Sequence, residues 1–335
     1  MSRNLLQAFL RVGVSLGALA VVIYLMRDKL RESLDILKTG VSWEWFFLAA
    51  VGYLLVQVIM AYRLFHFFRV QRIMLSYGQT LYLAILGLFF NLFLPSALGG
   101  DVAKIYYAYK HSGKKIESAT AILVDRLMGL FAISLIAILA IGWLHLQGKL
   151  PNPRILVGAV FFLCVIGGMT VFFGDDRIGA FLSRFSFLLP SVKIRQKISE
   201  VYGAVHGYKS HMGTLGIGLL LSVAGQGVLI FLYYWLARSL RLDVPPVAFF
   251  ALVPLICTAS MAPSLGGLGV REAGAVYFLS LYMPSEMALA HSLLMNILLY
   301  GFGALSGVLF ALRGGLGAAS SMPDLENSVD SVEGN

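Results

Sequence analysis

Two segments decide the fold of this chain: Asn91-Leu-Phe-Leu-Pro-Ser-Ala-Leu-Gly-Gly-Asp101 and Ala262-Pro-Ser-Leu-Gly-Gly-Leu-Gly-Val-Arg-Glu272. Each puts a proline, glycines and an acidic residue inside an apolar stretch. Because proline removes a backbone donor and glycine removes side-chain cover, backbone polar groups lose their partners there. Hydrocarbon tolerates such backbone only where it is buried in protein or lines a polar cavity. The pattern occurs once in each half, which predicts a transporter-like site built from paired broken helices; the alternative is two tight turns between ordinary spans.

The composition indicates a helical membrane protein. Of the 335 residues, 59% are hydrophobic and 13% are charged, an apolar share above that of soluble globular domains. Apolar runs such as 48–61 and 131–144 are continuous rather than alternating, which argues against a β-barrel. Full transmembrane helices, each close to the roughly 20 residues that a bilayer requires, are predicted at 8–26, 43–62, 121–145, 155–173, 213–236 and 287–312.

Between these spans lie the two broken segments, 80–109 and 246–283. The pieces beside each break are short for a full crossing, so we expect re-entrant hairpins. The chain is thus predicted to be an all-α polytopic membrane protein with about six full transmembrane helices and two broken re-entrant hairpins. Its halves, about 1–147 and 154–313, would form an inverted-topology repeat in one integral membrane domain, 1–313, and 314–335 would be a disordered acidic tail.

The distribution of Lys and Arg predicts the orientation. If both broken segments return to their own side, the loops at 63–80, 104–120 and 174–212 share one face, which carries more basic residues than the other. This excess predicts that the basic face is cytoplasmic and that both termini of this multi-pass protein are cytoplasmic. The 174–212 loop suits an amphipathic segment on an anionic leaflet, or equally a solvated loop with a short helix. Positive charge dispersed in loops reports orientation rather than a nucleic-acid partner.

Charged residues at membrane depth point to an anion site. Charges inside spans are costly, and free backbone N–H groups at the start of a half-helix, together with Lys or Arg, suit a phosphate-like anion. The alternative is that these charges form salt bridges that only hold the two halves together. Polar residues such as Gln226, His291 and Asn296 fit helix-to-helix hydrogen bonds better. The predicted substrate-binding residues are Asn91, Pro95, Gly99, Gly100, Asp101, Lys104, Asp125, Arg126, Pro263, Gly266, Gly267, Gly269, Arg271 and Glu272.

Signatures of enzymes and cofactors are scarce. The sequence has no HExxH, Walker A or GxSxG motif, and its histidines and cysteines form no metal-binding pattern. We therefore expect no cofactor and no metal. Asp175 and Asp176, at a membrane edge, keep an integral-membrane lipid or sugar transferase as an alternative function, although two adjacent acids in a loop are usually just solvated.

With these residues the chain resembles the membrane domain shared by lysylphosphatidylglycerol synthases and the stand-alone, flippase-like UPF0104 proteins of bacteria and archaea. The resemblance implies a role in moving or handling a lipid, such as an aminoacylated phospholipid or a polyprenyl-linked sugar. Where family members often have a glycine and a second proline, this chain has Ser96 and Leu265, so the backbone at both breaks is expected to be less open. The similarity covers about residues 5–313 and rests on Asn91-Leu-Phe-Leu-Pro95, Gly99-Gly100-Asp101, Lys104, Asp125-Arg126-Leu127, and Pro263 with Gly266-Gly267-Leu-Gly269-Val-Arg271-Glu272.

The residues and the resemblance together predict a lipid translocase. The headgroup of a phospholipid or polyprenyl-linked glycolipid would cross through the broken-helix site while its apolar chain stays in the bilayer. The expected partners are a lipid with an anionic or polyprenyl-phosphate-linked headgroup and an envelope-lipid biosynthesis enzyme. The short segment after the last span leaves no room for the soluble aminoacyl-transferase domain of full synthases, so that enzymatic activity is not expected. A non-catalytic membrane scaffold for an envelope-synthesis enzyme is a further alternative.

Overall fold

The structure is a computed structural model that describes residues 35–37, 40–93, 99–174, 200, 203–261 and 269–312. All regular secondary structure in this part of the chain is helical, as the composition predicts. The predicted first span at 8–26, the 314–335 tail and Asp175 with Asp176 lie outside the described residues. The helices are α2 (Trp43–Val70), α3 (Tyr77–Phe93), α4 (Gly99–Ser112), α5 (Lys115–Leu146), α6 (Ile155–Gly174), the 3-10 turn η2 (Gly207–His211), α9 (Met212–Ser239), α10 (Pro246–Ala259), α11 (Val270–Leu279) and α12 (Ser285–Leu312).

Four helices are long and apolar enough to cross a membrane. They are Trp43–Val70, Lys115–Leu146, Gly203–Ser239 and Ser285–Leu312. Each contains one of the predicted spans and extends beyond it, because a helix can continue past the apolar residues that cross the hydrocarbon. The helix α5, for example, has 32 residues, about 48 Å at 1.5 Å per residue, whereas the hydrocarbon core is about 30 Å thick. The helix α6 forms where the span at 155–173 was predicted.

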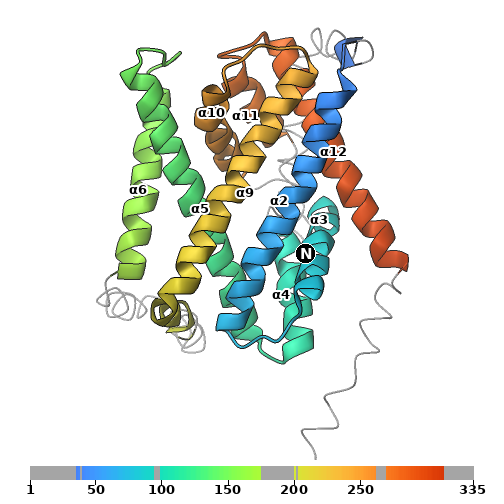
Figure 1. Cartoon of the computed structure of the whole chain (residues 1–335), viewed down its shortest axis with the longest axis vertical. Coiled ribbons are helices and arrows are strands. Elements are labelled where there is room, and N and C mark those ends of the chain that lie inside the picture. The colour runs from blue at the N-terminus through green and yellow to red at the C-terminus, as the bar shows by residue number, and fades with distance from the viewer. Residues whose placement is uncertain are drawn as a thin grey trace, which may run out of the picture.

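Helices end and begin on either side of both predicted breaks, whose residues 94–98 and 262–268 lie outside the described residues. The helix α3 ends at Phe93 and α4 begins at Gly99, while α10 ends at Ala259 and α11 begins at Val270. The two short helices of each pair pack against each other. Figure 1 places α3 and α4 in the lower part of the molecule and α10 and α11 at its upper end.

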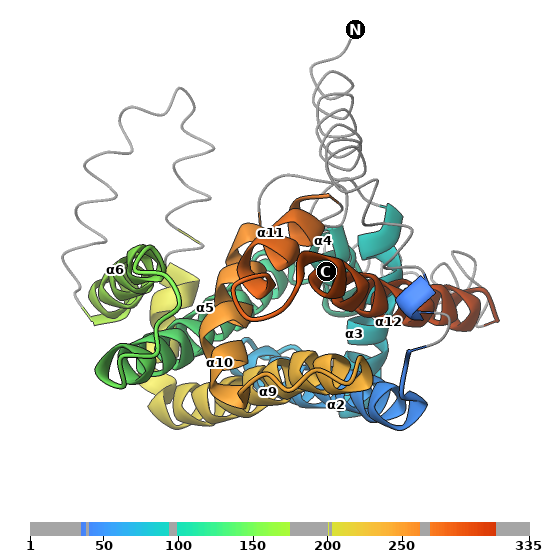
Figure 2. The ribbon, with the colours of Figure 1, turned by 90° about the horizontal axis from the view of Figure 1, so that it is seen from above.

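The helices α2 and α9 form an antiparallel pair along one side of the molecule (Figures 1 and 2). Glycines let the two helices approach closely. A Cβ atom on Gly52 would lie 2.7 Å from Cζ3 of Trp235, and one on Gly218 would lie 2.5 Å from Cζ of Phe67. Such small residues are the usual means by which membrane helices pack tightly, since lipid supplies no hydrophobic drive for their association.

The segments 43–146 and 212–312 repeat the order of a long helix, two short helices and a long helix. Their contacts also correspond: α3 packs on α12 as α10 packs on α5, and α4 packs on α5 as α11 packs on α12. In Figure 1 the equivalent long helices run in opposite directions, α2 downward and α9 upward. The helix α6 packs on α5 at the periphery (Figure 2). Buried apolar side chains form two clusters, one around α10 and the C-terminal half of α9, the other around the C-terminal half of α2.

Three of the long helices are followed, two positions after their last helical residue, by a residue with positive φ. After α5 this residue is Gly148, with φ 63°, as is usual for a helix end. After α2 and α9 it is an arginine, Arg72 with φ 54° and Arg241 with φ 59°. The left-handed conformation costs an L-residue free energy that glycine does not lose.

Candidate functional site

The first cluster of charges lies where α4 begins after the first break. Asp101, in the first turn of α4, accepts hydrogen bonds from Nε of Arg126 at 2.5 Å and from Nζ of Lys104 at 3.3 Å. The Asp101 side chain is only 7% exposed, whereas that of Arg126 is 44% exposed. Because one buried carboxylate is shared by two cations, the cluster has an excess positive charge on its accessible side.

The guanidinium of Arg126 has further hydrogen-bonding capacity. Its Nε donates to Asp101, and within the part of the chain that the structure describes its two terminal nitrogens have no hydrogen-bond partner. An open guanidinium edge matches the spacing of two oxygens on a phosphate or carboxylate. This arrangement suits an anion that approaches from the exposed side of Arg126.

Glycines and an asparagine hold α3 against α4. The Oδ1 atom of Asn91 accepts a hydrogen bond from the backbone N–H of Gly100 at 2.6 Å. A Cβ atom on Gly100 would overlap the carbonyl oxygen of Gly87, and one on Gly87 would lie 2.7 Å from Cε of Lys104. Gly99 and Gly100 are both buried. These residues therefore set the position of Asp101 and Lys104 by allowing the close approach of the two short helices.

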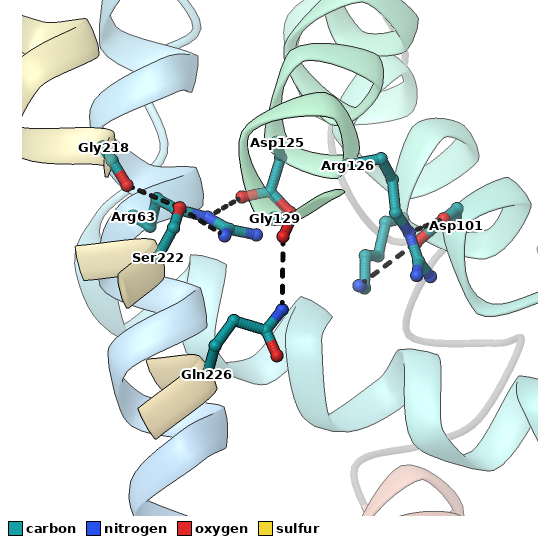
Figure 3. A network of polar contacts seen from close by, with 9 residues as sticks. Arg63, Asp101, Asp125, Arg126, Gly129, Gly218, Ser222 and Gln226 are labelled. Carbon is teal, nitrogen blue, oxygen red and sulfur yellow. Dashed lines mark hydrogen bonds and ion pairs between the residues drawn. The ribbon is translucent and has the colours of Figure 1, made fainter. Parts of the chain in front are cut away.

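A buried network lies on the other side of α5. The side chain of Arg63 donates from Nε to Asp125 at 2.7 Å and from Nη1 to Oγ of Ser222 at 2.8 Å, and Ser222 in turn donates to the carbonyl oxygen of Gly218 at 2.6 Å. This network joins α2, α5 and α9. Figure 3 shows Asp125 directed toward Arg63 while the next residue, Arg126, points toward Asp101.

The position of Arg63 corrects one expectation. The sequence analysis counted the loop 63–80 as starting at this residue, but α2 continues to Val70 and the Arg63 side chain is buried. A signal for this lay in the sequence, since Leu64, Phe67 and Phe68 continue an apolar helical face and are buried in the structure. Arg63 is therefore a core residue of the helix bundle and contributes nothing to the basic surface.

The second cluster lies where α11 begins after the second break. Oε2 of Glu272 accepts the backbone N–H of Gly269 at 2.5 Å, and Oε1 accepts from Arg271 at 3.1 Å and from Nδ2 of Asn296 at 2.8 Å. Nη2 of Arg271 also donates to Oδ1 of Asn296 at 2.6 Å and lies 3.4 Å from the Tyr300 hydroxyl. The single carboxylate balances the single guanidinium, so this cluster has no excess charge.

The two clusters are built alike. In each, an acidic residue in the first turn of the second short helix bonds a side chain of the following long helix, Asp101 with Arg126 and Glu272 with Asn296. Sequence reasoning assigned Asn296 to helix packing and did not single out Tyr300. Of the other predicted site residues, Pro95, Pro263, Gly266 and Gly267 lie outside the described residues.

Neither cluster has the composition of a metal site. Across the described ranges, no group of three or more His, Cys, Asp and Glu side chains could hold a metal ion. The chemistry that the two clusters offer is hydrogen bonding and charge, from guanidinium, ammonium, amide and phenol groups.

Comparison with known proteins agrees with this architecture. A UPF0104 membrane protein of Methanocaldococcus jannaschii is 23% identical over 297 residues, which cover 84% of this chain and 87% of that protein. No solved structure matches the chain significantly. The family described as lysylphosphatidylglycerol synthase TM region matches residues 9–307, which include both clusters. The chain is therefore a multi-pass membrane protein that belongs to the lysylphosphatidylglycerol synthase transmembrane-region family.

Proposed function

We propose that this protein is a lipid translocase of the bacterial inner membrane, which moves a lipid with an anionic headgroup past Asp101, Lys104 and Arg126. The observation that carries the proposal is the Arg126 side chain, which is 44% exposed and shares one buried carboxylate with Lys104, so that the cluster keeps an excess positive charge. A purely structural salt bridge would need one cation for one carboxylate. The family name supports a phospholipid or a related lipid as the substrate.

In the empty site, Asp101 neutralises part of the charge on its two cations. A phosphate group that binds the open edge of Arg126 would compete with Asp101 for that guanidinium. Asp101 would then pair with Lys104 alone, which is already its second partner. This exchange of partners keeps the buried carboxylate paired throughout, so the headgroup can bind and leave without exposing an unpaired charge to low dielectric.

We also propose that the two halves form an inverted-topology repeat, with each pair of short helices as a re-entrant hairpin. The supporting features are the repeated helix order, the corresponding contacts and the opposite directions of α2 and α9. In such repeats the site lies between the halves near the midplane, and rocking of one half against the other alternates access. The basic end, with the C-terminus of α2, would face the cytoplasm, and so would both termini.

Headgroup-resolved lipid scrambling in proteoliposomes tests the proposal. Liposomes would contain phosphatidylglycerol, phosphatidylethanolamine or a polyprenyl phosphate, and wild type would be compared with Arg126→Gln. We expect wild type to move at least one of these lipids, and Arg126→Gln to slow it by about tenfold or more, because a charge-assisted contact to phosphate is lost.

Arg154→Gln is the matched control, since Arg154 is an exposed arginine in the turn before α6, outside both clusters. We expect this variant to move lipid at the wild-type rate. Wild-type scrambling that persists in Arg126→Gln would exclude the first cluster as the pathway. If wild type moves none of the three lipids, the transferase and scaffold alternatives take precedence.

A further inference from the structure

The C-terminal end of α9 carries two further cationic side chains, Arg238 and Arg241, which belong to neither of the two clusters described above. Arg238 and Arg241 line a cavity of about 280 Å³ together with Ser42 and Trp45 of the α2 N-terminus. The guanidinium of Arg238 stands 5.6 Å from the centre of the Trp45 ring and bonds the exposed Asp243 at 3.1 Å. The lining of the cavity thus supplies two guanidinium groups, an indole and a hydroxyl.

The hydroxyl of Ser42 is available to a ligand. Ser42 precedes the first residue of α2, but its side chain makes no capping hydrogen bond. Its backbone N–H donates to the carbonyl oxygen of Ser239 at 2.7 Å, which ties the start of α2 to the end of α9. This hydrogen bond joins the two helix ends beside the cavity.

This cavity lies where α2 begins and α9 ends. It is at the end of two helices that are long enough to span the membrane, α2 and α9. Beside it, Trp43 begins α2 and is 60% exposed. Tryptophan at the end of a membrane helix marks the boundary between hydrocarbon and headgroups. Arginine and tryptophan side chains that meet at this depth face lipid phosphates.

The same motif occurs at the opposite end of the molecule. The helix α2 ends in Arg69-Val-Gln-Arg72-Ile73, and α9 ends in Arg238-Ser-Leu-Arg241-Leu242. Both ends close in one way: the N–H of Arg72 donates to the Arg69 carbonyl at 3.0 Å, and that of Arg241 donates to the Arg238 carbonyl at 2.9 Å. Arg69 also stands over an aromatic ring, 5.0 Å from the centre of Phe65. The sequence reasoning did not detect this repeat.

The backbone at these two positions favours glycine, yet both hold arginine. Arg72 and Arg241 are the non-glycine residues with positive φ in the described part of the chain. The comparable end of α5 has Gly148 at this position. Arginine at both equivalent positions runs against the preference of the backbone, which is consistent with a role for the guanidinium there.

We propose that the cavity of Ser42, Trp45, Arg238 and Arg241 binds the phosphate of a membrane lipid headgroup, and that Arg69 and Arg72 make the corresponding contact in the opposite leaflet. Guanidinium groups bind phosphate oxygens through paired charge-assisted hydrogen bonds. In a lipid translocase, two such contacts would collect the headgroup on one face and receive it on the other. The site itself requires only a lipid phosphate, and it goes beyond the proposed translocation pathway.

The test is binding of short-chain phosphatidylglycerol to the purified full chain in neutral detergent, measured by isothermal titration. All proteins would carry Arg126→Gln, Arg69→Gln and Arg72→Gly, so that neither the first cluster nor the opposite helix end contributes. We expect Arg241→Gly and Arg238→Gln each to raise the dissociation constant by about tenfold or more. Arg154→Gln, an exposed arginine outside the cavity, removes the same charge and should leave binding unchanged.

Arg241→Gly also distinguishes a loss of lipid binding from a loss of folding stability. Because glycine fits the left-handed position better, this variant should melt at or above the temperature of its parent. Inorganic phosphate is titrated in parallel; if it binds as tightly as the lipid and shows the same losses, the site is for free phosphate and the lipid assignment is wrong. Unchanged lipid binding in both arginine variants, or an equal loss in Arg154→Gln, would overturn the site. If the cavity does not bind lipid, the scrambling result with Arg126→Gln is unaffected, so failure of one proposal can be distinguished from failure of the other.

Discussion

Asp125 and Arg126 are consecutive residues of α5 whose side chains bind on opposite sides of that helix. Asp125 bonds the buried Arg63 of α2 at 2.7 Å, and Arg126 bonds Asp101 of α4 at 2.5 Å (Figure 3). The first pair is enclosed by helices, whereas the Arg126 side chain of the second is 44% exposed. One turn of α5 therefore connects the α2–α9 pair to α4, with a buried ion pair on one side and a more exposed one on the other.

Removing the buried partner should destabilise the protein. In Asp125→Ala the Arg63 guanidinium stays buried, with Ser222 as its remaining partner, and loss of one partner from a buried pair costs about 3–5 kcal/mol. We expect a lower free energy of unfolding in a detergent titration. The double variant Arg63→Met/Asp125→Leu should recover most of the loss, since it leaves no unpaired charge. Equal stability of wild type and Asp125→Ala would show that the pair is not needed for folding.

Neutralising Asp101 should tighten lipid binding, a change that is not expected if Asp101 only forms a structural salt bridge. Asp101→Asn leaves Lys104 and Arg126 without their shared carboxylate, so an anionic headgroup should bind more tightly, by about tenfold. Release should slow, and scrambling in proteoliposomes should fall. Binding of phosphatidylglycerol and scrambling rate, measured on the same preparation, check this. A loss of stability with no gain in lipid affinity would favour the purely structural alternative.

The α2–α9 contact should be sensitive to a single methyl group. A Cβ atom at Gly218 would lie 2.5 Å from the fully buried ring of Phe67, so Gly218→Ala should lower the free energy of unfolding by about 1–3 kcal/mol. Gly216 is the control in the same helix, because a Cβ there would meet nothing within 4 Å. Gly216→Ala should be neutral or stabilising by up to about 1 kcal/mol. Similar effects at both glycines would mean that helix propensity, and not packing against Phe67, determines the change in the free energy of unfolding.

The arginines at the helix ends should lower stability. Arg72→Gly places glycine at a position with φ 54° and should raise the free energy of unfolding by about 1 kcal/mol. The converse change, Gly148→Arg at φ 63°, should lower it by a similar amount. Thermal melts in detergent measure both. Destabilisation by Arg72→Gly would show that the guanidinium contributes more to folding than the backbone conformation costs.

Cysteine labelling should establish the orientation. Lys115 begins α5 and Gln147 follows its last residue, and both are exposed. In a background without Cys164 and Cys257, Gln147→Cys should react with a membrane-impermeant maleimide in intact cells, and Lys115→Cys only after the cells are permeabilised. The reverse pattern would invert the proposed topology, and labelling of both in intact cells would contradict a transmembrane α5.

Much of the helix layout followed from the sequence. Apolar runs of suitable length predicted the spans that became α2, α5, α9 and α12, because a backbone in hydrocarbon satisfies its hydrogen bonds within each helix and needs no distant partner. The end of α3 at Phe93 and the start of α4 at Gly99 flank one predicted break, and the end of α10 at Ala259 and the start of α11 at Val270 flank the other. The residues of the two breaks, 94–98 and 262–268, lie outside the described residues. The prediction of a single site that combines the acidic and basic residues after both breaks rested on local signals of this kind, and it stays a prediction.

The partners of the charged side chains were decided by the tertiary structure. Arg63 pairs with Asp125, 62 residues away, and with Ser222, 159 residues away, and nothing in the local sequence selects these partners. The sequence likewise gave no indication that Asp125 would be buried while its neighbour Arg126 stays accessible. Hydropathy and backbone chemistry act over one helix turn and fix where helices form. Which faces meet depends on the fit of distant side chains into glycine gaps, and that fit exists only once the helices are packed together.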